Sequence, residues 1–180
     1  MTPTNARKPL TLAIHPSVAG FGWAVFEGPL SPHDWGGAQV AIDKNAGCLK
    51  RIEILLDRFL PETLVLEAFE HRQTARRERI TKLCRGIVAM ANGRGIDVSI
   101  FSRDDVRATF AEVGARSRQE IAEAVGRQVD LLRRLVPKKR RAWESEAHVM
   151  AVFNAAAVAL THYRLSCHSL LDDLRDNALS

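Results

Sequence analysis

Three places in the sequence carry side chains whose types could act together on a phosphate ester. His15 closes the apolar run "LTLAIHP", and Glu67 closes the apolar run "ETLVLEA". The segment "WESEAHVMAVFN" adds Glu146, His148 and Asn154. Carboxylates at the ends of adjacent strands and on a covering helix can bind two Mg²⁺ ions about 4 Å apart, which hold the attacking and leaving oxygens of a phosphodiester. These residues therefore indicate metal-assisted phosphodiester hydrolysis.

The elements that would position these residues begin with a sheet. The run at 10–16 is apolar and ends in a proline, which is typical of a buried strand. The segments "FGWAVFEG" and "HDWGGAQVAI" flank the turn-rich "GPLSP", a pattern that predicts a β-hairpin. The chain is therefore expected to open with an antiparallel meander of three strands.

Strands and helices then alternate. Gly114 is a predicted helix stop, and Ser117 with Glu120 forms the S-x-x-E capping box that starts another helix. The pattern predicts strands over 62–68 and 96–102 and helices over 43–59, 74–92, 104–114, 117–136 and 144–164. The order βββ-α-β-α-β-α-α-α predicts an α/β fold, in which one mixed sheet, the meander plus parallel strands, is covered by helices. In that fold the first strand, the fourth strand and the last helix bring their candidate residues to one edge.

Composition indicates one globular domain outside the membrane. A chain of 180 residues with 46% apolar residues can bury a core of ordinary size, and we expect one domain over 10–166 between a flexible arm at 1–9 and a tail at 167–180. The arm lacks the apolar segment of a signal peptide, so a cytoplasmic location is expected. The longest apolar run, 150–160, is shorter than the roughly 20 residues that a membrane span needs.

The cysteines carry no metal-binding or redox motif. Cys48, Cys84 and Cys167 are far apart in the sequence, lie in apolar helical patterns and include no C-x-x-C pair. We therefore expect three buried free thiols.

Two basic clusters indicate a polyanionic partner. The formal net charge is +5, and basic residues concentrate at 71–82 and 133–143, each beside one of the acidic places. Lys and Arg gathered in this way release counterions from phosphates when they bind nucleic acid, and the alternative is two solvated faces. Trp143, next to four basic residues, is the candidate for stacking on a base. The candidate phosphate-binding residues are Arg72, Arg76, Arg77, Arg79, Lys138, Lys139, Arg140 and Arg141.

The order of these motifs resembles that of a known family. The segment "LAIHPSVAGFGWAV" is similar to a first strand of pattern L-x-I-D-P followed by G-x-G, "LVLEA" to a second acidic strand, and "WESEAHVMAVFNAAAVALTHY" to a last helix with D-A-x-A-L-A-L. From Leu10 to Tyr163 the chain resembles the RuvC-like Holliday junction resolvases of the RNase H-like superfamily. The resemblance implies an RNase H-like fold, divalent-metal-dependent cleavage of branched DNA, and a homodimer that suits a two-fold junction.

Residue by residue, the match to the family is partial. Glu67 stands at the second-strand glutamate and Glu146 at an acid ahead of the last helix, whereas His15 and Asn154 each replace an aspartate. An imidazole offers one nitrogen to one ion, so His15 cannot bridge two metals, and Asn154 keeps an oxygen ligand but loses a charge. The resemblance thus implies a catalytic and metal site of Glu67, Glu146, Asn154 and His15. His148 is a substitute ligand or, alternatively, part of a solvated helix face.

The number of remaining charges leads to three functional hypotheses. With two acids exchanged, about two negative charges remain to face two divalent ions, which favours a protein that binds branched or duplex DNA, has a degenerate metal site and cleaves weakly or not at all. The second hypothesis is an active endonuclease that uses Mg²⁺ or Mn²⁺ and a metal-activated water. The third is a structural or assembly protein that retains only the fold. For His15, a packing role, contact with nucleic acid and metal ligation all stay open.

Overall fold

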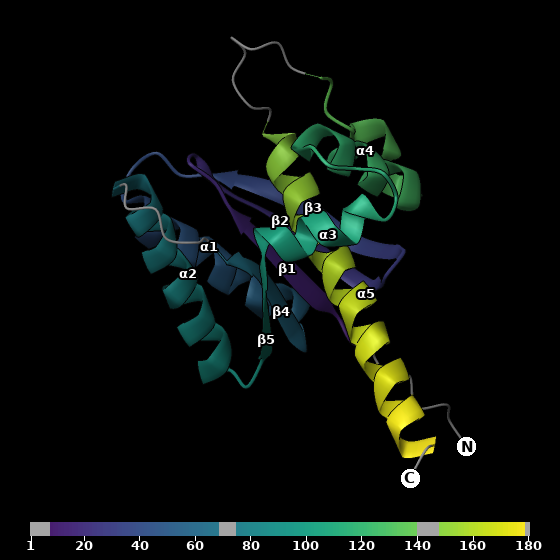
Figure 1. Cartoon of the computed structure of the whole chain (residues 1–180). Helices are drawn as coiled ribbons and strands as arrows, with labels where there is room; N and C mark the ends of the chain where they lie inside the picture. Colours follow the sequence, from purple (N-terminus) through teal and green to yellow (C-terminus); the bar gives the residue numbers. More distant parts are fainter. Residues whose placement is uncertain (1–7, 69–74, 140–147, 179–180) are drawn as a thin grey trace, which may run out of the picture.

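A five-stranded sheet forms the centre of the chain, of which the computed structural model describes residues 8–68, 75–139 and 148–178 (Figure 1). The strands are β1 (Thr11–Pro16), β2 (Gly20–Gly28), β3 (Ser31–Gln39), β4 (Thr63–Ala68) and β5 (Asp97–Ser102). Their order in the sheet is β3-β2-β1-β4-β5, with antiparallel pairing from β1 to β3 and parallel pairing from β1 through β4 to β5. The predicted α/β class and its mixed sheet are confirmed.

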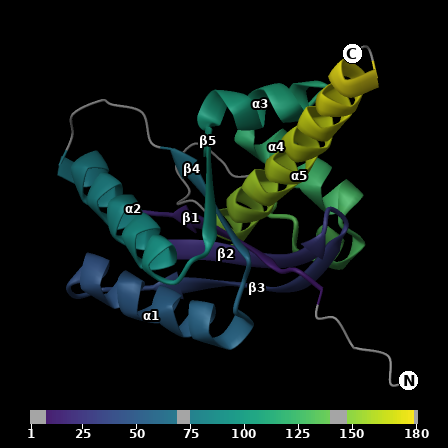
Figure 2. The same cartoon turned by 90° about the horizontal axis from the view of Figure 1, so that it is seen from below.

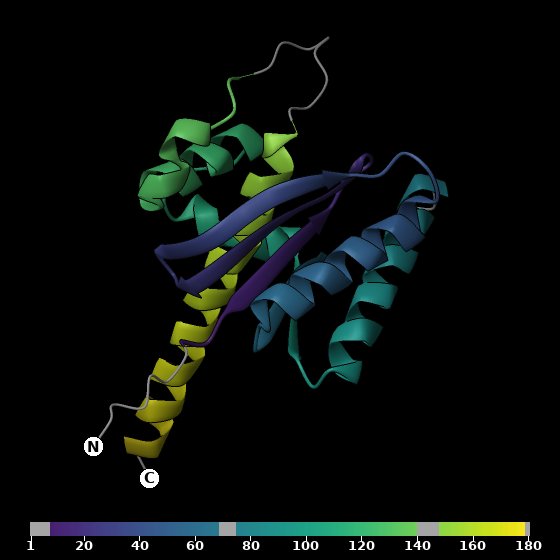
Figure 3. The ribbon, with the colours of Figure 1, turned by 180° about the vertical axis from the view of Figure 1, so that it is seen from behind.

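Helices cover both faces of this sheet. They are α1 (Lys44–Phe59), α2 (Ala75–Gly93), α3 (Arg103–Ala111), α4 (Arg118–Gln128), the 3-10 helix η1 (Asp130–Leu135) and α5 (Val149–Ala178). Figures 2 and 3 show α1 and α2 on one face and α3, α4 and α5 on the other. Because both faces are covered, every residue of β1 is buried although its side chains alternate between the faces.

This alternation divides the core into two clusters. Leu12 of β1 and Leu64 of β4 pack in the cluster that contains the apolar residues of α1 and α2. Ala13 and Val65 point the other way, into the cluster formed with α3, α4 and α5. The odd-numbered positions of β1 and β4 therefore face α5, and the later odd positions of the two strands are those of the candidate site.

Close contact between β2 and α5 depends on Gly22. A Cβ built at Gly22 would lie 2.2 Å from the carbonyl carbon of Ala151, far inside ordinary van der Waals contact. Gly22 is also the antiparallel partner of His15 in β1. Glycine at this position therefore sets how closely the first turn of α5 approaches the end of β1.

The predicted helix over 117–136 is wrong as a single element. α4 ends one residue before Val129, which adopts an extended conformation (φ −114°, ψ 94°), and η1 follows. The chain then folds back onto Gly126, where a Cβ would lie 2.3 Å from Cγ2 of Val136. Because Val129 and Leu132 are nevertheless buried in the same cluster, the apolar spacing runs without interruption through the break.

The predicted capping box at the start of α4 is confirmed, and α3 has a second one. The hydroxyl of Ser117 accepts from the backbone N–H of Glu120, whose carboxylate accepts from the backbone N–H of Ser117 at 2.8 Å. Ser102 and Asp105 form the same pair of hydrogen bonds at the start of α3. The two boxes fix the first turns of α3 and α4.

Helix α5 continues past the predicted end of the last helix. It runs to Ala178, so residues 165–178 are helical as well, and the part of the predicted helix at 144–147 lies outside the described residues. The limits of the arm, the domain and the tail stay predictions. None of the helices in the described part of the chain has both the length and the apolarity that a bilayer crossing requires.

All three cysteines are free thiols, but only Cys48 is buried. Cys84 is half-buried and Cys167 is exposed, so the expectation of three buried thiols is wrong for these two. Cys167 lies in α5, the last part of which extends beyond the sheet (Figures 1 and 3). Burial raises the pKa of Cys84 to about 11, so this thiol is protonated at neutral pH.

Candidate functional site

His15 and Glu67 lie side by side at the carboxyl ends of two parallel strands. In the register of β1 and β4, Ile14 pairs with Leu66, so the next positions along the two strands are His15 and Glu67. Both are odd-numbered positions that face α5, and both are buried, with 7% and 8% of their surface exposed. The expected meeting of the two strand ends is confirmed.

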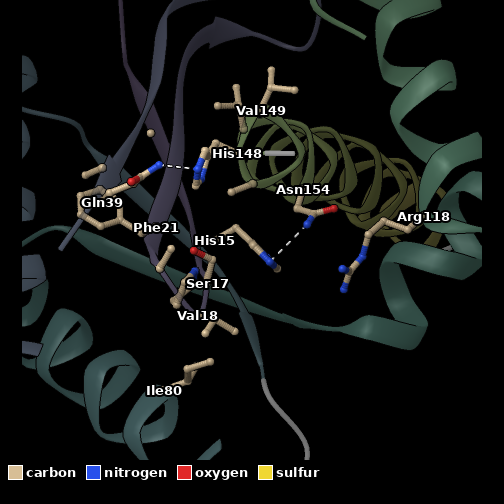
Figure 4. A pocket seen from close by; sticks show the side chains of 16 residues that line it. His15, Ser17, Val18, Phe21, Gln39, Ile80, Arg118, His148, Val149 and Asn154 are labelled. Carbon is tan, nitrogen blue, oxygen red and sulfur yellow. Dashed lines mark hydrogen bonds between the residues drawn. The ribbon is translucent and has the colours of Figure 1, made fainter. Parts of the chain in front are cut away.

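His15 connects Glu67 to the last helix (Figure 4). Its Nδ1 lies 3.2 Å from Oε2 of Glu67, and its Nε2 lies 3.3 Å from Nδ2 of Asn154 on α5. An amide nitrogen only donates, so Nε2 is the acceptor in the contact with Asn154, and Nδ1 is the ring nitrogen beside the carboxylate of Glu67. The imidazole of His15 thus fills the space between the carboxylate of Glu67 and the amide of Asn154.

Arginines stand near the carboxylate of Glu67. Burial by itself raises the pKa of Glu67, but the interactions with His15 and then the charges of Arg103 and Arg118 outweigh burial, so the pKa lies below its ordinary value of 4.5. Arg103 is the first residue of α3 and Arg118 the first residue of α4, directly after the two capping serines. Glu67 is therefore ionised at neutral pH, and cations of the protein balance its charge.

Two cavities share this edge of the sheet. The smaller has a volume of about 80 Å³ and the larger about 770 Å³, and His15, Arg118 and Asn154 line both. Figure 4 shows the larger cavity, with Arg118 extending from α4 toward the space beside His15 and Asn154. Glu67 lines the smaller cavity. Four arginines, hereafter the cavity arginines, also line the smaller one: Arg103, Arg107, Arg116 and Arg118.

His148 is separate from this cluster. Its ring points at Gln39 of β3, with which it forms a hydrogen bond, and it lines the larger cavity but not the smaller one over Glu67 (Figure 4). His148 is also exposed, which agrees with the alternative of a solvated helix face.

The described residues do not fit a divalent-metal centre. No group of three or more His, Cys, Asp or Glu side chains that could hold an ion occurs among them, and Glu146 lies outside them. Within the described chain, Glu67 is the one carboxylate that lines the smaller cavity, and its Oε2 lies 3.2 Å from Nδ1 of His15. A divalent ion there would be repelled by the nearby guanidinium groups.

The structure describes part of the two predicted basic clusters. The guanidinium of Arg79 donates to Oδ1 of Asn45 and to the carbonyl oxygen of Ser17, both at 3.0 Å, and so ties α2 to α1 and to the turn after β1. Lys138 and Lys139 are exposed after η1. The described side chains do not include those of Arg72, Arg76, Arg77, Arg140, Arg141 and Trp143.

The cavity arginines were not predicted from the sequence. They stand singly among acidic, polar and apolar residues, and none belongs to a basic run. The sequence feature that could have indicated Arg103 and Arg118 is the pair of S-R-x-[DE] segments at 102–105 and 117–120. A capping serine directly before an arginine places that arginine at the first helical position. Helix α3 begins directly after β5, and α4 begins after the loop that follows α3.

Comparison with known proteins identifies the fold. No protein-family model and no curated protein sequence matches the chain. RuvC of Thermus thermophilus matches in structure with a TM-score of 0.66 and 19% identity over 89% of this chain and 96% of that one. RuvC of T. thermophilus in complex with a Holliday junction substrate gives 0.62 and 17% over 86% and 92%. The yeast mitochondrial Holliday junction resolvase Ydc2 gives 0.53 and 14% over 91% and 86%. The chain therefore has the RuvC-like RNase H-like fold that its motif order predicts.

Proposed function

We propose that this chain binds branched or duplex DNA and cleaves it weakly or not at all. The observation that carries the proposal is the 3.2 Å contact between Nδ1 of His15 and Oε2 of Glu67. It puts an imidazole, rather than a second carboxylate, at the strand end beside Glu67. Two-metal hydrolysis needs several acids to offset the charge of two divalent ions, and this pair supplies one carboxylate.

The distribution of positive charge supports DNA as the partner. The formal net charge is +5, and the cavity arginines lie at the same edge of the sheet as Glu67. T. thermophilus RuvC, which has the same fold, has been solved in complex with a Holliday junction substrate. Arginines that grip phosphates position nucleic acid without reading its bases, so we expect selectivity for the shape of the DNA rather than for its sequence.

We also propose that the chain acts as a homodimer. Two copies related by a two-fold axis would present two basic edges to a four-way junction, which has matching symmetry. Light scattering during size-exclusion chromatography should then give twice the 20.0 kDa mass of one chain. A strict monomer at all concentrations would contradict this part of the proposal.

A metal-dependent endonuclease is the second candidate. Glu67 stays ionised at the end of β4, and structural neighbours of the chain include Holliday junction resolvases. In this version Mg²⁺ or Mn²⁺ would be held by Glu67, Glu146 and Asn154 with His15 or His148, and a metal-bound water would attack the phosphate.

A binding and cleavage assay separates these functions. We expect the unaltered chain to bind a four-way junction in EDTA and to leave it uncut in Mg²⁺ and in Mn²⁺. Cleavage that disappears in Glu67→Ala but persists in Glu62→Ala would overturn the proposal and establish the endonuclease. Glu62 is the matched control because it is an exposed glutamate directly before β4. Failure to bind any DNA or RNA would instead favour a structural or assembly protein that retains only the fold.

A further inference from the structure

The turn that joins β1 to β2, residues 17–20, is held by its own hydrogen bonds and by the end of β3. The backbone N–H of Ser17 donates to the carbonyl oxygen of Gly20 at 2.8 Å, and the N–H of Gly20 donates to the hydroxyl of Ser17 at 3.2 Å. The carbonyl oxygen of Ala19 accepts from the N–H of Val40 at 2.8 Å. The backbone of this β1–β2 turn is therefore fixed from within and from the neighbouring strand.

Two cations from the helices on one face of the sheet also bind this turn. The guanidinium of Arg79 on α2 donates to the carbonyl oxygen of Ser17 at 3.0 Å, and the ammonium of Lys44 on α1 donates to that of Val18 at 3.2 Å. Hydrogen bonds from charged donors are about twice as strong as those between neutral groups. Both helices are thus joined to the turn that directly follows the His15 strand.

Asn45 orients the guanidinium of Arg79. Its side-chain oxygen accepts from Nη1 of Arg79, and its amide nitrogen donates to the backbone carbonyl oxygen of Arg79, both at 3.0 Å. This reciprocal pair directs the other guanidinium nitrogen, Nη2, at the turn. Because Asn45 is uncharged, a substitution there can release the arginine without changing the charge of the protein.

The β1–β2 turn lies at the candidate site and exposes one side chain. Ser17, Val18 and Ala19 line the larger cavity together with His15, and Figure 4 shows Ser17 next to His15. At the tip of the turn, Val18 has 45% of its surface exposed. DNA bound at this edge of the sheet would therefore meet a turn whose shape is already set.

We propose that the β1–β2 turn contacts the DNA with its exposed tip, and that Arg79 is the positioning residue that holds this turn. This inference rests on the proposed function, since it names a contact surface for the DNA. It gives Arg79 an indirect role instead of the phosphate contact expected from its place in a basic cluster. A turn that is ordered before binding costs less conformational entropy when the complex forms, so its anchors contribute to affinity without touching DNA.

The first test separates positioning from phosphate contact by measuring junction binding in EDTA over a range of salt concentrations. We expect Arg79→Gln and Asn45→Ala each to weaken binding by roughly two- to tenfold, because the turn must then be ordered on binding. The double variant should lose no more than the weaker single variant, since both act through one contact. The slope of log K against log salt concentration should stay the same, whereas loss of a phosphate contact lowers it by about 1.

Two exposed residues on the same helices provide matched controls. Arg51→Gln on α1 removes one positive charge, and Asn92→Ala on α2 removes one amide, and both should bind the junction as the unaltered chain does. A slope that falls by about 1 in Arg79→Gln, with normal binding in Asn45→Ala, would show that Arg79 contacts a phosphate and would overturn the inference.

The second test places a negative charge at the tip of the turn. An aspartate that lies against DNA is repelled by the phosphates, whereas one more than about 10 Å away is largely screened at 0.1 M salt. Val18→Asp should therefore weaken junction binding at least about tenfold. Ile54→Asp is the control, because Ile54 is exposed on α1, and it should have little effect. Equal affinities of the two variants would rule out contact between the turn and the DNA while the proposed function stands.

The third test needs no DNA. Amide hydrogen exchange at Ser17 and Gly20, whose N–H groups close the turn, should become faster in Arg79→Gln and in Asn45→Ala and stay unchanged in both controls. Unchanged exchange would show that Arg79 does not hold the turn. Faster exchange in a chain that binds neither junction nor duplex would remove the proposed function, and with it the DNA contact, and would leave Arg79 with a structural role alone.

Discussion

Nδ1 of His15 lies 3.2 Å from Oε2 of Glu67 because β1 and β4 are parallel and end at the same level. The register brings together two positions that lie far apart in the sequence, at the edge of the sheet next to α5. A histidine at this position places an imidazole, rather than a second carboxylate, beside the carboxylate of Glu67.

Restoring the two exchanged acids should create metal-dependent stability. In the double variant His15→Asp with Asn154→Asp, three carboxylates would meet at this edge, and their repulsion should lower the free energy of unfolding in EDTA. Mn²⁺ at one hundred times its dissociation constant should then raise that free energy by about 2.7 kcal/mol. Urea unfolding with and without Mn²⁺ measures the effect. An equal gain in the unaltered chain would show that the native residues already bind the ion.

The stability that Glu67 contributes should depend on pH. Because its pKa in the folded chain is below the ordinary value of 4.5, the ionised carboxylate stabilises the fold above that value, and this contribution is lost as the pH falls through the folded pKa. Glu67→Gln should therefore lower the free energy of unfolding by about 1.5–3 kcal/mol at pH 7, and the difference from the unaltered chain should shrink as the pH falls below the ordinary value of 4.5. Urea titrations over this range provide the measurement, with Glu62→Gln as the control. A difference that grows toward acid pH would refute the assignment.

Adding one methyl group to β2 should disturb the site indirectly. In Gly22→Ala the new Cβ would lie 2.2 Å from the backbone of Ala151, so α5 must move away from the sheet, at a cost of about 1–3 kcal/mol. The displacement should also lengthen the 3.3 Å contact between His15 and Asn154. Thermal unfolding and a crystal structure of the variant test both effects. Gly28→Ala in the same strand is the matched control, since a Cβ at Gly28 would have no atom within 4 Å and the stability should hardly change.

The cap of α4 should contribute to DNA affinity as well as to stability. Ser117→Ala removes the hydroxyl that accepts from Glu120 and should cost about 1 kcal/mol. Because Arg118 follows this cap, fraying of the first turn should also weaken junction binding in EDTA. Ser117→Thr keeps a hydroxyl and should retain most of both properties. If Ser117→Ala loses stability but binds the junction as before, the cap does not position Arg118 for the DNA.

The sequence is sufficient to predict which strands carry the candidate residues, but not to predict the arginines that lie near them. Apolar runs mark β1 and β4, and parallel pairing forces His15 and Glu67 to one edge, so their meeting could be predicted. The break after α4 could not, because Val129 stays buried and keeps the apolar spacing through a change of backbone conformation. The cavity arginines were missed for a similar reason. Each is a single residue in the sequence, and only the two capped helix starts bring them together.

Because Gly22 has no side chain, the spacing between the strand ends and α5 does not depend on which side chains stand at positions 15 and 154. The distance between the strand ends and α5 is fixed by backbone contact at Gly22 and Ala151, which involves neither His15 nor Asn154. Residues at positions 15 and 154 can therefore differ in chemical type while the scaffold around them keeps its dimensions. In a protein built in this way, a few substitutions can alter the chemistry of the strand ends without altering the fold.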